Sequence, residues 1–191
     1  MCVGVLALQG DFREHAALLE DLGVESVLVR MPADLDGIGG LVVPGGESTT
    51  IGKLADRFGL IDPLRAVIRD GLPTLGTCAG MIFLAGATTE TRSQVQLGVL
   101  DVVVQRNAFG RQVESFEANV LVRGIEGGPV HAVFIRAPWI EKVGEDVEVL
   151  GEVRGHPVVV REGNVYATSF HPELIGDGRI HTLVFATVQE A

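Results

Sequence analysis

The chain has 191 residues, with 15 Lys or Arg against 25 Asp or Glu, so its formal net charge is −10 at pH 7. Hydrophobic residues make up 47%, which is ordinary for a globular protein and excludes general disorder. The acidic balance disfavours nucleic acid and anionic membrane surfaces as partners. With two cysteines, no signal-like N-terminus and no membrane-length apolar run, we expect one domain over residues 1–191 in a reducing cytoplasm.

The first half of the chain alternates short apolar runs with amphipathic segments. The runs predict strands at 3–8, 27–29, 41–43 and 73–75. Helices are expected after Asp11, which with Glu14 resembles a capping box, then after Ser48 as a cap, and at 61–68 and 79–84. Gly23 should stop the first helix. This alternation predicts a three-layer α/β fold with a mainly parallel central sheet flanked by helices.

The second half changes character and is rich in strands with short turns. They are expected at 99–104, 116–122, 130–135, 147–153, 158–160 and 165–170, before a closing helix at 180–188. We expect these strands to be antiparallel additions to the edge of the sheet. Ligands of such sheets bind beyond the carboxyl ends of the strands, so the residues that follow each strand are the candidates for a site.

Cys78 lies between Gly76 and Gly80, where a predicted strand meets a predicted helix. This is the pattern of a nucleophile elbow with Cys in place of Ser. A helix N-terminus favours the thiolate, and the N–H of Ala79 would point at a developing oxyanion. A buried, unreactive cysteine is the alternative.

His171-Pro172-Glu173 follows a predicted strand. In an extended segment, Glu173 can reach one imidazole nitrogen while the other faces a thiol, which is the base-and-orienter logic of a catalytic triad. Alone, the motif is typical of a surface turn. Together with the elbow, it favours catalysis.

A glycine turn, Pro44-Gly45-Gly46-Glu47-Ser48, makes Gly46 a candidate second oxyanion donor, although a plain strand-to-helix turn has the same pattern. A phosphate loop is excluded, because Glu47 and Leu54 stand where that motif needs Gly and Ser or Thr. No dinucleotide fingerprint and no metal-ligand spacing is present, so we expect no cofactor and no metal. Residues 106–112 (RNAFGRQ) and Arg136 could bind a carboxylate, the alternative being solvated loops.

These motifs together resemble the class I (triad) glutamine amidotransferases, which have a flavodoxin-like fold, and they stand in that family's chain order. The RNAFGRQ and FIRAP stretches, with residues 8–15, make the chain most similar to the glutaminase subunits of pyridoxal 5′-phosphate synthase. The resemblance implies that Cys78 is the nucleophile, His171 the base and Glu173 its orienter, with an oxyanion hole at Gly46 and Ala79.

The resemblance also implies glutamine hydrolysis, with ammonia passed to a separate synthase subunit in a heteromeric complex. It implies glutamine binding by Gly46, Glu47, Ser48, Arg106, Ile135 and Arg136. It further implies a partner-facing segment that includes Gln9, Glu14 and His15. We hypothesise that docking there orients the Gly45–Gly46 peptide. The alternatives are the glutaminase of another synthase, such as that of histidine synthesis, a stand-alone cysteine hydrolase, and a non-catalytic glutamine-binding module.

Overall fold

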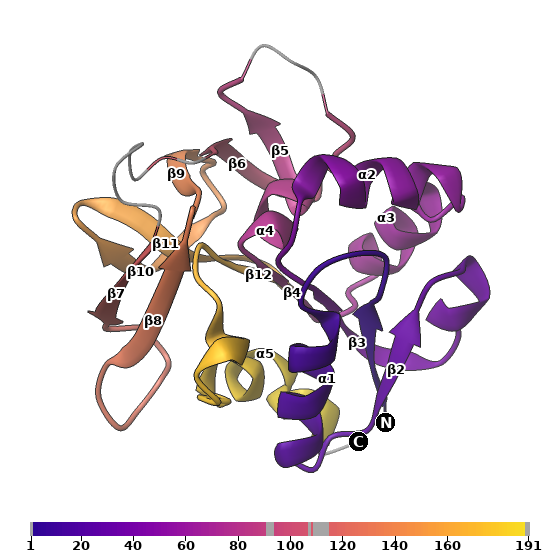
Figure 1. Cartoon of the computed structure of the whole chain (residues 1–191), viewed down its shortest axis with the longest axis horizontal. Helices are drawn as coiled ribbons and strands as arrows, with labels where there is room; N and C mark the ends of the chain where they lie inside the picture. The colour runs from indigo at the N-terminus through magenta and orange to yellow at the C-terminus, as the bar shows by residue number, and fades with distance from the viewer. Residues whose placement is uncertain (1, 91–93, 107, 109–114, 190–191) are drawn as a thin grey trace.

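The computed structural model describes residues 2–90, 94–106, 108 and 115–189 and is organised around a seven-stranded sheet (Figure 1). The strand order is β10-β11-β12-β4-β3-β1-β2. Five strands are parallel: β1 (Cys2–Leu6), β2 (Ser26–Val29), β3 (Ile38–Val43), β4 (Thr74–Thr77) and β12 (Val165–Thr168). The strands β10 (Glu148–Val153) and β11 (His156–Glu162) extend one edge antiparallel.

Helices cover both faces of this sheet (Figure 1). One face carries α1 (Phe12–Asp21) and α5 (Arg179–Gln189), and the other carries α2 (Ser48–Arg57), α3 (Ile61–Arg69) and α4 (Ala79–Leu84). Strand alternation divides the core accordingly: Leu41 and Val43 of β3 pack in the cluster that holds α2 to α4, whereas Val42 packs in the cluster beneath α1 and α5. The expected three-layer, mainly parallel α/β fold is therefore confirmed.

The remaining strands correct one prediction. A three-stranded sheet contains β5 (Ala85–Thr88), β6 (Leu100–Gln105) and β9 (Trp139–Val143), and β7 (Ser115–Val120) pairs with β8 (Val130–Ile135) as a separate ribbon. Only β10 and β11 are antiparallel additions to the central sheet, and β12 joins it in parallel. The strands β5 and β9 were missed, because the segment AGAT lacks apolar alternation and β9 directly follows Pro138.

Turn chemistry explains where the first helix ends. Gly23 has a φ of 72°, its N–H donates to the carbonyl of Glu20, and the N–H of Val24 donates to that of Leu19. The predicted glycine stop is thus confirmed. Two short 3-10 turns, η1 (Pro32–Leu35) and η2 (Pro172–Leu174), complete the described elements. In the part of the chain that the structure describes, no helix has the length and apolar character needed to span a bilayer.

Candidate active site

A cleft of about 390 Å³ opens at the carboxyl ends of the parallel strands. Its lining contains most of the residues that the sequence singled out, namely Gln9, Gly46, Glu47, Ser48, Cys78, Ala79, Arg106, Ile135, Arg136 and His171. They come from the end of β8 and from the segments that follow β1, β3, β4, β6, β8 and β12, so segments that are distant in the sequence converge on one place. The fold thus brings the predicted site residues together at the expected edge of the sheet.

Cys78 stands at the N-cap of α4 in a strained conformation, with φ 49° and ψ −103°. Tight packing enforces this turn. A Cβ on Gly76 would meet the Leu84 side chain and the Gly80 backbone, and a Cβ on Gly80 would overlap the carbonyl oxygen of Val43. The N–H of Cys78 donates to the carbonyl of Thr168 on β12 at 2.8 Å. The elbow geometry therefore forms, with the thiol at a helix N-terminus.

His171 makes the contacts expected of a base. Its Nδ1 lies 2.7 Å from Oε1 of the buried Glu173. Burial opposes the imidazolium, but the hydrogen bonds and charges of Cys78 and Glu173 outweigh it and raise the pKa of His171 to about 10. Burial also raises the pKa of Glu173, against the effect of His171. The site thus favours the protonated form of His171.

The backbone around His171 differs from the expected extended segment. Pro172 opens the 3-10 turn η2, and Glu173 lies within that turn. A proline at the first position suits the turn, because its φ is already fixed near the helical value. The carboxylate still reaches the imidazole, so the contact forms although the predicted local conformation was wrong.

Asp11 is not the helix cap that its spacing to Glu14 suggested. Its side chain makes no capping hydrogen bond, and its Oδ2 lies 3.4 Å from Nδ1 of His171 instead. Two carboxylates therefore face the same nitrogen. Ligand atoms of Asp11, His171 and Glu173 lie within 4.8 Å of one another, and these residues could hold a metal ion.

The glycine turn lies against the loop after β1. Gly46 has a φ of 148°, and a Cβ there would meet the side-chain amide of Gln9. The carbonyl of Gly45 accepts a hydrogen bond from the Asp11 N–H at 3.1 Å, and the N–H of Glu47 donates to Oε1 of Gln9 at 2.6 Å. The orientation of the Gly45–Gly46 peptide is therefore set by polar contacts with the segment that precedes α1.

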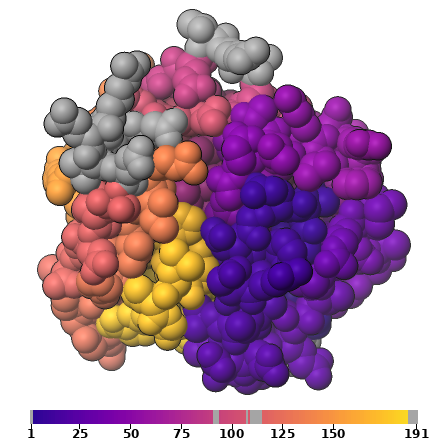
Figure 2. All heavy atoms as spheres, viewed as in Figure 1, coloured from indigo at the N-terminus to yellow at the C-terminus, as the bar shows by residue number. Residues whose placement is uncertain are grey.

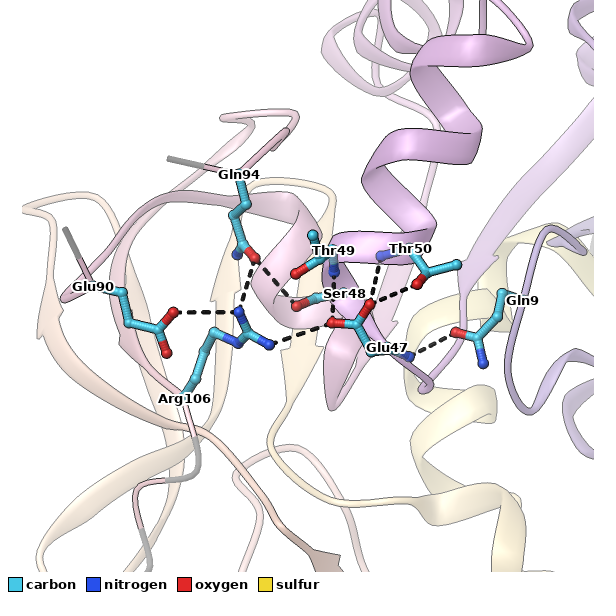
Figure 3. A network of polar contacts seen from close by, with 8 residues as sticks. All are labelled: Gln9, Glu47, Ser48, Thr49, Thr50, Glu90, Gln94 and Arg106. Atoms are coloured by element: carbon cyan, nitrogen blue, oxygen red, sulfur yellow. Dashed lines mark hydrogen bonds and ion pairs between the residues drawn. The ribbon is translucent and has the colours of Figure 1, made fainter. Parts of the chain in front are cut away.

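Glu47, and not Ser48 as predicted, caps α2 (Figure 3). Its carboxylate accepts from the N–H groups of Thr49 and Thr50 at 3.1 and 2.7 Å. Burial acts against ionisation, yet these hydrogen bonds and that of the Thr50 hydroxyl lower the pKa of Glu47 to about 2. A glutamate is long enough to reach both N–H groups, which explains why it replaces the expected serine.

Arg106, in the turn after β6, crosses the cleft to the same carboxylate (Figure 3). Its guanidinium lies 3.4 Å from Glu47 and 3.3 Å from Glu90, and it donates to the Gln94 amide oxygen. Across the cleft, Ile135 ends β8 and Arg136 follows it with a φ of 43°. Of the predicted RNAFGRQ loop, residues 107 and 109–112 lie outside the described residues.

Sequence reasoning missed a buried polar group behind Glu173. No sequence motif surrounds His15 or His181, yet Nδ1 of His15 lies 2.8 Å from Nε2 of His181. Both side chains are buried. His15 belongs to the predicted partner-facing segment, and its side chain is 0% exposed, so it lies beneath the surface of that segment. Glu14 is exposed and Gln9 half-buried. One available signal was the helical spacing of His15 with Leu18 and Leu19, all on the buried face.

The chain is similar in sequence to known proteins over nearly its whole length. The model of the SNO glutamine amidotransferase family matches residues 5–190. The pyridoxal 5′-phosphate synthase subunit PdxT of a Nocardioides species is 57% identical over 98% of this chain and 96% of its own length. The subunit of the same name from Streptomyces coelicolor is 60% identical over 95% of this chain and 90% of its own length.

Solved structures give the same result. One crystal structure of a glutamine amidotransferase superposes with a TM-score of 0.93 at 52% identity, covering 98% of both chains. A GMP synthase subunit from Thermoplasma acidophilum, with a TM-score of 0.69 and 19% identity over 100% of this chain and 98% of that one, shares the fold. The matched family model and the relatives cover nearly the whole sequence. The chain therefore belongs to the SNO glutamine amidotransferase family.

Proposed function

We propose that the whole chain is one glutaminase domain that hydrolyses L-glutamine to L-glutamate and ammonia, and that it supplies the ammonia to a pyridoxal 5′-phosphate synthase subunit in a heteromeric complex. The observation that carries this proposal is the arrangement of Cys78, His171 and Glu173 at the base of the cleft. The names of relatives that are 57–60% identical supply the pathway. The two unpaired cysteines fit a reducing cytoplasm.

The charges in the cleft suit an amino acid. Arg106 and Arg136 attract a carboxylate, and Asp11 and Glu47 attract an ammonium group. Because both signs lie in one small cleft, a zwitterion satisfies it better than an anion or a cation does. Gly46, Ser48 and Ile135 complete the proposed glutamine site.

The proposed reaction starts from the thiolate of Cys78, which attacks the side-chain carbonyl carbon of glutamine. The N–H groups of Gly46 and Ala79 stabilise the oxyanion. The imidazolium of His171 then protonates the leaving ammonia, and a glutamyl thioester remains on Cys78. His171, now neutral, takes a proton from water, which attacks the thioester and releases glutamate. Glu173 keeps the imidazole oriented throughout.

We infer that the partner controls this reaction through the segment before α1. Gln9 and Asp11 hold the glycine turn by two hydrogen bonds, and the exposed Glu14 lies one turn further along. A synthase subunit docked on this segment would act on the Gly45–Gly46 peptide without entering the cleft. Gating would prevent waste of glutamine in the free chain.

The test is glutamate release from glutamine by the purified chain, with and without a pyridoxal 5′-phosphate synthase subunit, alongside Cys78→Ala. Activity that needs the partner and falls at least about 10³-fold in the variant supports the proposal. Equal activity without a partner overturns the gating and favours a stand-alone hydrolase. Activity with the synthase of another pathway instead, or none with either, overturns the assigned function.

A further inference from the structure

Behind the proposed triad, two histidines extend the chain of polar contacts into the core. His15 on α1 and His181 on α5 come from the two ends of the sequence, which lie side by side in Figure 2 (indigo and yellow). Nε2 of His15 lies 3.3 Å from Oε2 of Glu173 and 3.1 Å from the Thr77 hydroxyl. Thr77 directly precedes Cys78 in the chain. The pair therefore contacts the site from its buried side.

Both histidines are neutral, and this limits which nitrogen of each ring can donate a hydrogen bond and which can accept one. Burial lowers the pKa of His181 to about 4, and burial, with the charges of His181 and His171, lowers the pKa of His15 well below its usual 6.5. A neutral imidazole carries one N–H, so each ring donates from one nitrogen and accepts at the other. Only one nitrogen of His15 can therefore be the donor.

The carboxylate of Glu173 decides which nitrogen donates. Its Oε1 accepts from His171, whereas its Oε2 is buried and has no hydrogen bond of good geometry among the described residues. A lone pair of His15 facing that anion at 3.3 Å would be repulsive, whereas an N–H there is attracted to it and can also donate to the Thr77 hydroxyl. The proton of His15 thus belongs on Nε2.

The contacts of His181 agree with this assignment. With its proton on Nε2, His15 accepts at Nδ1 from the Nε2–H of His181. Nδ1 of His181 is then a bare lone pair, and among the described residues this buried atom has no hydrogen-bond partner. The opposite direction would leave a buried N–H without an acceptor there, which native structures rarely tolerate.

We propose that His15 is a positioning residue for the triad: its Nε2–H holds the outer oxygen of Glu173, so that the inner oxygen stays aligned with His171, and His181 fixes the tautomer of His15. This inference rests on the proposed glutaminase function. His15 is not among the residues that line the cleft, so it acts on the site through its contact with Glu173. Without it, the buried carboxylate loses a donor and holds the imidazolium of His171 less well.

The activity test compares His15→Leu with His15→Gln in the complex with the synthase subunit. Glutamine can place an N–H near the position of the lost Nε2, whereas leucine cannot. We expect kcat to fall about 10-fold or more for leucine, with KM within about twofold of wild type, and to recover largely for glutamine. The exposed His131→Leu serves as the control and should change neither constant. If His15→Leu does not fold, His15→Asn replaces it, since its amide is too short to reach Glu173.

A second readout needs no activity. In a Cys2→Ser background, the rate of Cys78 alkylation by iodoacetamide against pH reports the thiolate. We expect its midpoint to rise in His15→Leu but not in His15→Gln. Equal kcat losses and equal melting-temperature losses in both variants, with an unchanged alkylation profile, would assign His15 to packing and overturn the inference. If the wild-type complex releases no glutamate, the proposed function fails, and the alkylation profile alone decides on His15.

Discussion

Two turns that follow the neighbouring parallel strands β3 and β4 line the cleft, and both are closely packed. In the turn after β4, which carries Cys78, a Cβ on Gly80 would overlap the backbone of β3. In the turn after β3, which carries Gly46, a Cβ would meet the side chain of Gln9, and hydrogen bonds with Gln9 and Asp11 also hold the turn. The first turn is thus fixed by buried backbone atoms, whereas the second also depends on polar contacts at an exposed position.

Packing and polar contacts suit two different requirements of such a site. A nucleophile must be placed to within a fraction of an ångström, and dense packing provides that precision. An oxyanion donor that is to respond to a partner needs a low barrier between two states, and exposed polar contacts provide it.

The largest effect is expected for Gly80→Ala. The new methyl group would overlap the Val43 carbonyl, a backbone atom that cannot move aside, so the free energy of unfolding should fall by about 3 kcal/mol and activity should be lost. Denaturant unfolding measures this. Gly86→Ala is the matched control, because its nearest contact would be an ordinary 3.5 Å. A Gly80→Ala protein as stable as the control would contradict packing as the constraint.

Lowering the pH should first destabilise the buried part of the site, where His181 lies. His181, with a pKa of about 4 when folded and about 6.5 when unfolded, contributes stability that is present above pH 6.5 and lost as the pH falls towards 4. At pH 5 the loss from His181 is about 2 kcal/mol. His15, whose pKa is also lowered, adds to the loss, and His171 and Glu173, whose pKa values are raised, offset a part of it. Glu47, with a pKa of about 2, stays ionised there.

Urea unfolding at pH 7.5 and pH 5 tests this prediction. His181→Gln keeps a donor towards His15 but does not titrate, so its stability should fall less between the two pH values than that of the wild type. An identical fall in the two proteins would show that His181 is not the group responsible.

A smaller effect is expected for Glu47→Gln. The amide keeps part of the helix cap but loses the charge that orders Arg106, so KM for glutamine should rise roughly 3- to 10-fold, with a smaller change in kcat. Glu90→Gln is the comparison, because Glu90 pairs with the same guanidinium without capping a helix. Steady-state kinetics should give a smaller rise for it. Equal rises in KM for the two variants would show that the helix cap made by Glu47 does not contribute to glutamine binding.

The smallest effect is expected for Gln9→Met, which deletes the acceptor of the Glu47 N–H. One neutral hydrogen bond is worth about 1 kcal/mol, so kcat in the complex should fall about fivefold while the melting temperature changes little. Glu20→Gln, at an exposed position of α1, is the control. If kcat is unchanged, Gln9 does not orient the turn.

The same contrast separates what the sequence could predict from what it could not. The parallel half was predicted well, because strands such as β3 are single apolar runs followed by a Pro-Gly-Gly turn, as at residues 41–46. The site followed from local motifs at Cys78 and His171. Strands such as β6 and β8 alternate buried and exposed residues, which reveals a buried face but not the strand that pairs with it. Their separate sheets could not be foreseen.

The contacts that were missed join residues far apart in the chain. His15 meets Thr77, 62 residues away, and His181, 166 residues away, so no spacing rule connects them. The local rules at Asp11 and Ser48 also failed, because tertiary partners decided otherwise: His171 attracts the Asp11 carboxylate, and Glu47 reaches the helix N-terminus first. Capping patterns predict that a helix starts, not which side chain satisfies it.

The positive φ of Cys78 makes the reactive residue a burden on the fold. A non-glycine residue in that conformation costs about 1–3 kcal/mol, a cost that glycine avoids. An inactive chain with glycine at position 78 would therefore be more stable than the enzyme itself. Selection for stability alone would replace the proposed nucleophile, so its presence in the sequence fits a role for which stability is given up.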